Sequence, residues 1–180
     1  MILLSPHDDD NALYASFTCI REKPLVVVVT DSWIQPNRGE KGCSAQERAE
    51  ETRKACETLG CRVFRLGIKD TELNEWNLKE ALKPYLHEKT VYAPAIQGGN
   101  FQHDLVGRIA KEIFGDVIQY TTYTKTELWT KGDIEIIPTE EENGLKKRAL
   151  AQYFSQLQLP SVYPHFVAVI NKSEWLIKNF

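Results

Sequence analysis

A cluster of ionisable side chains near the start of the sequence constrains the fold more than any other feature. His7 and the three aspartates Asp8 to Asp10 occupy four consecutive positions, directly after the apolar run 2–4 and before the helix-like segment 12–20. Three adjacent carboxylates repel one another, and burying them without a compensating cation is prohibitively unfavourable. The stretch therefore predicts a bound cation, and a metal ion is the simplest candidate.

The composition excludes several classes of protein. The chain has 180 residues, 42% hydrophobic and 26% charged, which predicts one globular domain over residues 1–180. A net charge of −3 without a Lys/Arg-rich block argues against a nucleic-acid or anionic-membrane partner. No apolar run approaches the roughly 20 residues of a membrane span, and no signal peptide is recognisable. The four cysteines form no CxxC pair, so we expect free thiols and a cytoplasmic protein.

Strands and helices alternate over the first 120 residues. The unbroken run Leu-Val-Val-Val-Val at 25–29 suits a parallel sheet covered on both faces. The pattern predicts an α/β fold, a three-layer α/β/α sandwich around a mostly parallel Rossmann-like sheet. Predicted strands span 1–5, 25–30, 62–66, 90–93 and 116–120. Predicted helices span 10–21, 44–59 (with a capping box at Ser44 and a C-cap at Gly60), 78–87 and 103–114.

The last third of the sequence is less regular. Residues 121–137 predict one or two extended segments. Their apolar side chains could form a contact between subunits, so a homo-oligomer is possible. A helix is expected at 145–157, an extended segment at 166–170, and a terminal helix at 173–180 with Ser173 as its N-cap. His165 follows Pro164 in a predicted loop and has no recognisable partner there.

Polar side chains follow each of the first four strands. Residues 7–10 follow the first, Asp31 the second and Asp70 the third, while Asn100 and His103 follow the fourth. In open parallel sheets, ligands bind beyond the carboxyl ends of the strands. We therefore expect these side chains to meet at one edge of the sheet.

The residue types at this edge favour a catalytic zinc site. His7 and Asp10 lie three residues apart at a strand-to-helix turn, and His103 opens another helix on the same edge. Two histidines and one carboxylate, with a position left for water, are typical of catalytic zinc. A carboxylate that does not bind the metal would serve as general base. Asp9 can fill that role, although spacing alone does not separate it from Asp8.

Other interpretations of the same residues exist. A His–Asp cluster is often a solvated turn or a helix N-cap, and Asp31 can cap a turn as easily as contact a substrate. The aspartates could instead bind Mg²⁺ for phosphoryl transfer. That hypothesis lacks a phosphate-binding Gly-rich loop followed by Lys, and it leaves His7 and His103 without a role.

The segment Pro6-His-Asp-Asp-Asp10 resembles the Pro-His-Pro-Asp-Asp motif of the LmbE-like (PIG-L) zinc-dependent N-deacetylases. Further segments resemble that family in the same order along nearly the whole chain. They are Val26–Asp31, Arg48-Ala-Glu-Glu51 with Ala55 and Leu59-Gly60, Leu66–Asp70, Asn100–His103 with Val106-Gly107, Lys147–Leu150 with Ser155-Gln156, and Glu174.

The resemblance implies an LmbE-like fold and a role for each matching residue. His7, Asp10 and His103 would bind Zn²⁺, and Asp9 would be the general base. Arg48 would contact the substrate or brace the site, and Asp70 would lie near the substrate. Asp31 is a further candidate substrate-binding residue. The implied reaction is hydrolysis of an acetamide on a small-molecule substrate, typically an N-acetylglucosamine-type sugar or a conjugate.

Four positions depart from the family pattern. Asp8 stands where the family has Pro, and Asn11 where Glu is usual; we expect Asp8 to face solvent. Asn100 replaces the first His of a His-x-x-His pair, and Gln102 replaces an Asp. Asn100 can donate a hydrogen bond to an oxyanion but cannot deliver a proton. A non-catalytic sugar- or nucleotide-binding protein on the same fold is therefore a further hypothesis.

Overall fold

The computed structural model describes residues 1–32 and 42–178 of the chain. The described residues form a seven-stranded sheet in the order β3-β2-β1-β4-β5-β7-β6. Its strands are β1 (Ile2–Ser5), β2 (Leu25–Thr30), β3 (Arg62–Ile68), β4 (Val91–Pro94), β5 (Ile118–Tyr120), β6 (Ile134–Ile136) and β7 (Glu174–Lys178).

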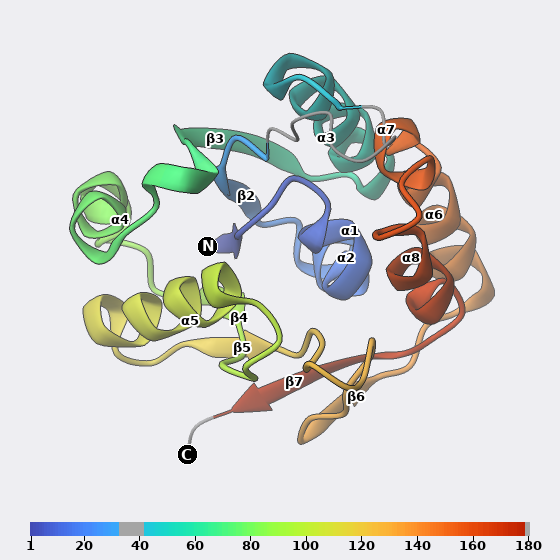
Figure 1. Ribbon diagram of the computed structural model, residues 1–180. Helices are drawn as coiled ribbons and strands as arrows, with labels where there is room; N and C mark the ends of the chain where they lie inside the picture. The colour runs from blue at the N-terminus through green and yellow to red at the C-terminus, as the bar shows by residue number, and fades with distance from the viewer. Residues whose placement is uncertain (33–41, 179–180) are drawn as a thin grey trace.

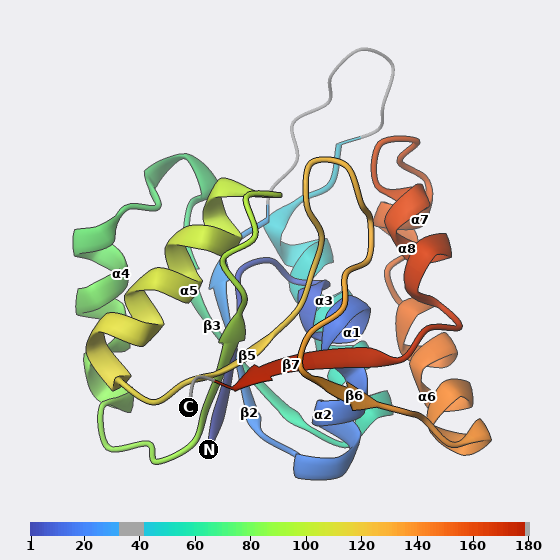
Figure 2. The same ribbon diagram turned by 90° about the horizontal axis from the view of Figure 1, so that it is seen from below.

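Helices cover both faces of this sheet, as Figures 1 and 2 show. On one side lie α4 (Glu75–Leu82) and α5 (Phe101–Phe114). On the other lie α1 (Asp10–Tyr14), α2 (Ser16–Glu22), α3 (Ala45–Leu59), α6 (Glu140–Leu150), α7 (Phe154–Leu157) and α8 (Tyr163–Val169). The predicted three-layer α/β/α sandwich is confirmed. None of the described helices is both long and apolar enough to cross a membrane.

The valine run at the centre of the sheet divides its side chains between two cores. Val26 and Val28 pack in the core under α1 to α3, whereas Val27 and Val29 pack in the core under α4 and α5. Successive side chains of a strand point to opposite faces, so a strand buried on both faces has to be apolar throughout. The strand pairs β2–β3, β1–β2, β1–β4 and β4–β5 are all parallel. The predicted mostly parallel sheet is therefore confirmed.

The C-terminal elements differ from the prediction. Residues 174–178 form a strand, β7, which pairs antiparallel with β5 and β6, so the helix expected at 173–180 is wrong. The extended segment expected at 166–170 is also wrong, because α8 occupies Tyr163–Val169. Both segments are short, and periodicity cannot separate a strand from a helix over so few residues. Pro164 in the first turn of α8 is a helix-start signal.

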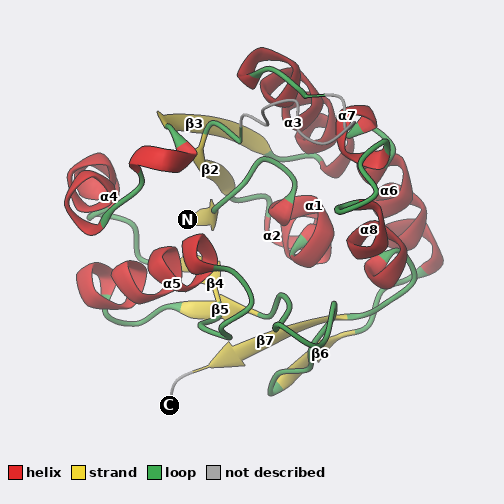
Figure 3. Ribbon diagram, in the orientation of Figure 1, coloured by secondary structure: helices red, strands yellow, loops and turns green. Residues whose placement is uncertain are grey.

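Several helix boundaries also shift. The helix predicted at 10–21 is split at Ala15 into α1 and α2. Capping boxes at Asn74 and Thr139 start α4 and α6 earlier than expected, and α6 ends at Leu150 instead of continuing to residue 157. The capping box at Ser44 and the left-handed C-cap at Gly60, with φ of 75°, are confirmed. Figure 3 shows that the segment leading from β5 to β6 is loop, so only 134–136 of the segment 121–137 is a strand.

A buried ion pair joins β7 to the α-helical layer beside β1. The Glu174 carboxylate accepts hydrogen bonds from the backbone N–H groups of Ser16 and Phe17 at the start of α2. Lys146 of α6 reaches the same carboxylate at 3.0 Å, and both side chains are buried. Glu174 of β7 therefore caps the N-terminus of α2. This cap explains why the helical segment can be interrupted at Ala15.

This pair gives a stability test of the fold. Replacing Lys146 by Met leaves a buried carboxylate without its cation, which we expect to cost about 3–5 kcal/mol. The matched Lys147→Met change, on an exposed position of the same helix, should stay within about 0.5 kcal/mol of wild type. Urea unfolding of the three proteins measures both values. Equal stability of the two variants would contradict the role assigned to Lys146.

Candidate metal centre

Three of the predicted residues meet at the carboxyl edge of the sheet. His7 lies in the turn after β1, Asp10 is the first residue of α1, and His103 lies in the first turn of α5. Asp10 Oδ2 is 3.0 Å from His7 Nδ1 and 3.1 Å from His103 Nε2, and the two ring nitrogens are 3.2 Å apart. These three atoms form a compact triangle, here called the His7–Asp10–His103 triad.

The triad fits a tetrahedral metal ion. Metal–ligand bonds of 2.0–2.1 Å in a tetrahedron place the ligand atoms about 3.3 Å apart, close to the separations seen here. The Oε1 atom of Gln102 lies 2.5 Å from His7 Nε2. Because that oxygen only accepts, it holds the proton on Nε2 and leaves His7 Nδ1 free to bind a cation. A metal-bound histidine usually has such a partner on its other nitrogen.

Packing of the fold fixes where His103 can lie. Gly107, one turn further along α5, sits so close to β4 that an added Cβ would lie 2.3 Å from the carbonyl oxygen of Pro94. Asn100 caps the same helix, since its Oδ1 accepts from the backbone N–H groups of Gln102 and His103. The helix start is thereby held against the strand end, and His103 is buried beside Asp10.

The charges in the triad depend on one another. Burial alone would lower the pKa of His7, but the charge of Asp10 and the hydrogen bond to it outweigh burial and raise the pKa to about 9. Burial alone would raise the pKa of Asp10, but His103 and His7 hold it well below its usual range. A cation bound here therefore has to displace a proton from a histidine and take over its neutralising role.

The other two aspartates pair with arginines. Asp9, next to the triad, forms an ion pair with Arg48 of α3 at 3.2 Å, and the Arg48 side chain is only 1% exposed. Asp8 is completely buried, with its carboxylate 2.7 Å from both Arg65 of β3 and the Thr52 hydroxyl. The expectation that Asp8 faces solvent is therefore wrong. The sequence spacing did not show that an arginine from β3 reaches under the turn.

The triad opens onto a cavity of about 240 Å³. Its lining residues come from the metal edge and from the helices above it: His7, Asp9, Asp10, Leu13, Tyr14, Ser32, Arg48, Asp70, Tyr123, Gln156, Ser161, Val162 and His165. Arg48 and Asp70, two of the candidate substrate-binding residues, line the cavity. Asp31 and Asn100 are not among its described lining residues.

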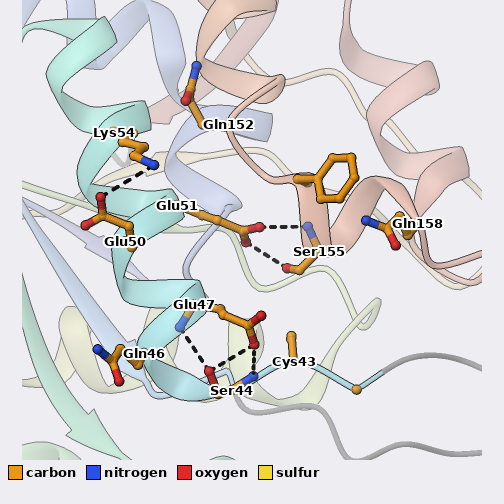
Figure 4. A pocket seen from close by; sticks show the side chains of 12 residues that line it. Cys43, Ser44, Gln46, Glu47, Glu50, Glu51, Lys54, Gln152, Ser155 and Gln158 are labelled. Carbon is orange, nitrogen blue, oxygen red and sulfur yellow. Dashed lines mark hydrogen bonds and ion pairs between the residues drawn. The ribbon is translucent and has the colours of Figure 1, made fainter.

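A second, larger cavity of about 460 Å³ lies between α3 and α7 and does not include the triad. Figure 4 shows Glu51 within it, accepting hydrogen bonds from the backbone and hydroxyl of Ser155, each at 2.7 Å. Glu51 also pairs with Arg48, the partner of Asp9. Glu51, which lines this second cavity, therefore connects Arg48 to α7 and holds the arginine in place.

Sequence reasoning missed His165 and two tyrosines of the cavity. Tyr14 ends α1, Tyr123 follows β5, and His165 lies on α8. The sequence does contain a signal for the helix that carries His165. Val162, Phe166 and Val169 are apolar at helical spacing, and Pro164 marks the start of the helix. Recognising that helix would have made His165 a residue on a rigid element instead of a residue in a loop.

The fold and site together define a three-layer α/β protein with a candidate metal centre at the carboxyl edge of its parallel strands. Residues 2–114, more than half of the chain, match the PIG-L family, described as GlcNAc-PI de-N-acetylase. The chain therefore belongs to the PIG-L family. This membership supports a deacetylase or related hydrolase.

Solved structures share the fold over nearly the whole chain. A triple mutant of the deacetylase Orf2* from the teicoplanin biosynthetic pathway has a TM-score of 0.71 at 14% identity, covering 99% of this chain and 98% of that chain. The 4-carboxy-2-hydroxymuconate hydratase GalB from Pseudomonas putida KT2440 has a TM-score of 0.65 at 16% identity, covering 99% and 95%. The conserved protein TT1542 from Thermus thermophilus has a TM-score of 0.63 at 19% identity, covering 99% and 94%. No curated protein sequence matches the chain.

The triad makes a direct prediction about metal binding. Wild-type protein should bind one zinc ion per chain, and His103→Ala should weaken that binding by more than about 100-fold, because it removes a ligand and not only a supporting residue. Equilibrium dialysis against a competing chelator measures the affinity. His87→Ala is the matched control, since the His87 side chain is 76% exposed. Equal affinities for all three proteins would rule out the triad as the site.

Proposed function

We propose that the chain is a zinc-dependent N-deacetylase that hydrolyses the acetamide of an N-acetylglucosamine-type sugar or a related small glycosylated substrate. The observation that carries the proposal is the placement of Asp9. Its carboxylate lines the same cavity as His7 and Asp10 of the triad, yet its ion pair is with Arg48 and not with the triad. A metal site with a separate carboxylate beside it is the arrangement that metal-assisted hydrolysis needs.

Zinc held by His7, Asp10 and His103 would polarise the substrate carbonyl and make a water molecule acidic enough to react near neutral pH. Asp9 then accepts the proton of that water through its carboxylate. Arg48, buried and braced by Glu51, orients the Asp9 carboxylate between turnovers. As the oxygen of that water bonds to the acetamide carbon, Asp9 holds the proton and then passes it to the amide nitrogen. The C–N bond then breaks, which releases the neutral amine and acetic acid, which ionises to acetate.

The remaining predicted residues have narrower proposed roles. Asp70 lines the cavity, and its Oδ1 is buried without a hydrogen-bond partner among the described residues, which favours a contact with a substrate hydroxyl. Asn100 is proposed as a donor to the developing oxyanion. Its Oδ1 caps α5 and its side chain also hydrogen-bonds Tyr123, so one amide N–H remains for that task. Asp31 remains a predicted substrate contact.

The ligand atoms of the triad discriminate between zinc and the alternative metal, Mg²⁺. Mg²⁺ prefers oxygen ligands and retains several waters, whereas two of the three ligand atoms here are imidazole nitrogens. The donor chemistry therefore favours zinc over a magnesium phosphoryl-transfer site. A cytoplasmic location and a homo-oligomer remain predictions from the sequence.

Activity and metal binding can be separated at Asp9. Zinc-loaded wild type should release acetate from members of a panel of N-acetylhexosamines, and Asp9→Asn should lower kcat by about 10²–10⁴-fold because it removes a general base. Zinc affinity should stay near that of wild type. Asp116→Asn, at an exposed position, is the control. An Asp9→Asn protein with wild-type kcat would eliminate Asp9 as the base, and an inactive wild type would favour a binding protein.

A further inference from the structure

His165 is an imidazole that lines the cavity beside the triad, and no step described above uses it. It lies on α8, which packs against α1, and it lines the same cavity as His7, Asp9 and Asp10. It is only partly buried and forms no ion pair within the described residues. A titratable side chain placed beside a candidate metal site and accessible to a ligand is a candidate for chemistry.

One ring nitrogen of His165 has a defined partner. The hydroxyl group of Tyr14 lies 3.1 Å from His165 Nδ1. Burial raises the pKa of Tyr14 well above its usual value, so Tyr14 keeps its proton and can donate it into this hydrogen bond. A neutral imidazole that accepts at Nδ1 carries its own proton on Nε2. Tyr14 thus selects the tautomer in which Nε2–H is a donor.

The position of the ring is fixed by an aromatic stack. Tyr123 makes an edge contact with His165, with ring centroids 4.7 Å apart, and a second edge contact with His103 at 5.2 Å. An added Cβ at Gly99 would lie 2.1 Å from the carbonyl oxygen of Tyr123. The loop that contains Gly99 therefore packs directly against the backbone of Tyr123 and limits its movement. His165 is therefore held at a set separation from the triad, through Tyr123.

Burial lowers the pKa of His165, which favours a neutral ring near pH 7. Burial lowers its pKa first, and His103 lowers it further, while Asp9 and Asp10 oppose them; the result lies below the ordinary value of 6.5. The two tyrosines that touch it, Tyr14 and Tyr123, are uncharged because their own pKa values are raised. A neutral imidazole is a hydrogen-bond donor and not a source of protons.

Two other donors that line the cavity already have partners. Arg48 is paired with Asp9 and Glu51, and Tyr14 donates to His165. Asn100 uses its side-chain oxygen on the α5 cap and one amide N–H on Tyr123, which leaves one N–H as the second donor proposed above. His165 Nε2 has no hydrogen bond within the described residues, so its N–H is left for a ligand in the cavity.

We propose that His165 donates a hydrogen bond from Nε2 to the carbonyl oxygen of the substrate acetamide as that oxygen gains negative charge, with Tyr14 as the residue that positions its ring. The inference rests on the proposed deacetylase function. The proton stays on Nε2 throughout, so His165 adds no step to the proton balance between water, Asp9 and the amine. Removing one such preorganised donor lowers kcat by about 10²–10³-fold in enzymes that use it.

Variants at position 165 separate a donor from a proton source. We expect His165→Phe to lower kcat on N-acetylglucosamine by about 100-fold or more. His165→Gln, which keeps an N–H donor but does not titrate, should recover at least tenfold of that loss. His87→Gln is the control. Thermal unfolding and zinc affinity should match wild type in all three. Wild-type kcat in His165→Phe, or equal losses in the Phe and Gln variants, would overturn the proposal.

Two readouts do not depend on turnover. In metal-free protein, ¹⁵N chemical shifts should show the Nε2–H tautomer of His165, and Tyr14→Phe should shift it towards Nδ1–H. Zinc-loaded protein should bind acetate, the expected product, about tenfold more tightly than its His165→Phe variant. If wild type hydrolyses no N-acetylhexosamine, the proposed function fails, and acetate binding decides the donor role alone. An Nδ1–H tautomer in wild type, or equal acetate affinities, would overturn it.

Discussion

Separate neutralisation of three adjacent carboxylates is the constraint on which the rest of this structure depends. Asp8 is held by Arg65 from β3, Asp9 by Arg48 from α3, and Asp10 by the two histidines of the triad. Two of the three charges are thus compensated by the protein itself, and Asp10 alone requires a cation or protonated histidines. Burial of the turn after β1 is possible because three separate elements converge on it.

The C-terminal third of the chain completes the site that the N-terminal strands begin. Glu51 links Arg48 to Ser155 of α7, and Glu174 of β7 caps α2. Tyr153, after α6, donates a hydrogen bond to the backbone oxygen of Asp8. The metal edge is consequently covered by helices α7 and α8, and the cavity has walls from both halves of the sequence. Asp70 and His165, from the two halves of the sequence, both line this cavity.

The sequence predicted the parallel half of the sheet and the meeting of His7, Asp10 and His103, because a doubly buried valine run and the strand-end rule are strong signals. It did not predict β7 or α8, whose few residues carry no decisive period. The burial of Asp8 was also missed. Its partner Arg65 lies 57 positions away on β3, which is separated from β1 by β2 in the sheet. Only the pairing of β2 with both strands brings the two side chains together. His165 was missed for the same reason as α8.

The central claim is that one metal ion joins His7, Asp10 and His103 while Asp9 stays outside the coordination sphere. A crystal structure of zinc-loaded protein, with anomalous scattering measured on both sides of the zinc absorption edge, tests it most directly. The account predicts one zinc peak about 2.0–2.2 Å from His7 Nδ1, an Asp10 oxygen and His103 Nε2, with the Asp9 carboxylate still paired to Arg48. A zinc ion bound by Asp9 or Asp8, or no zinc at the triad, would contradict it.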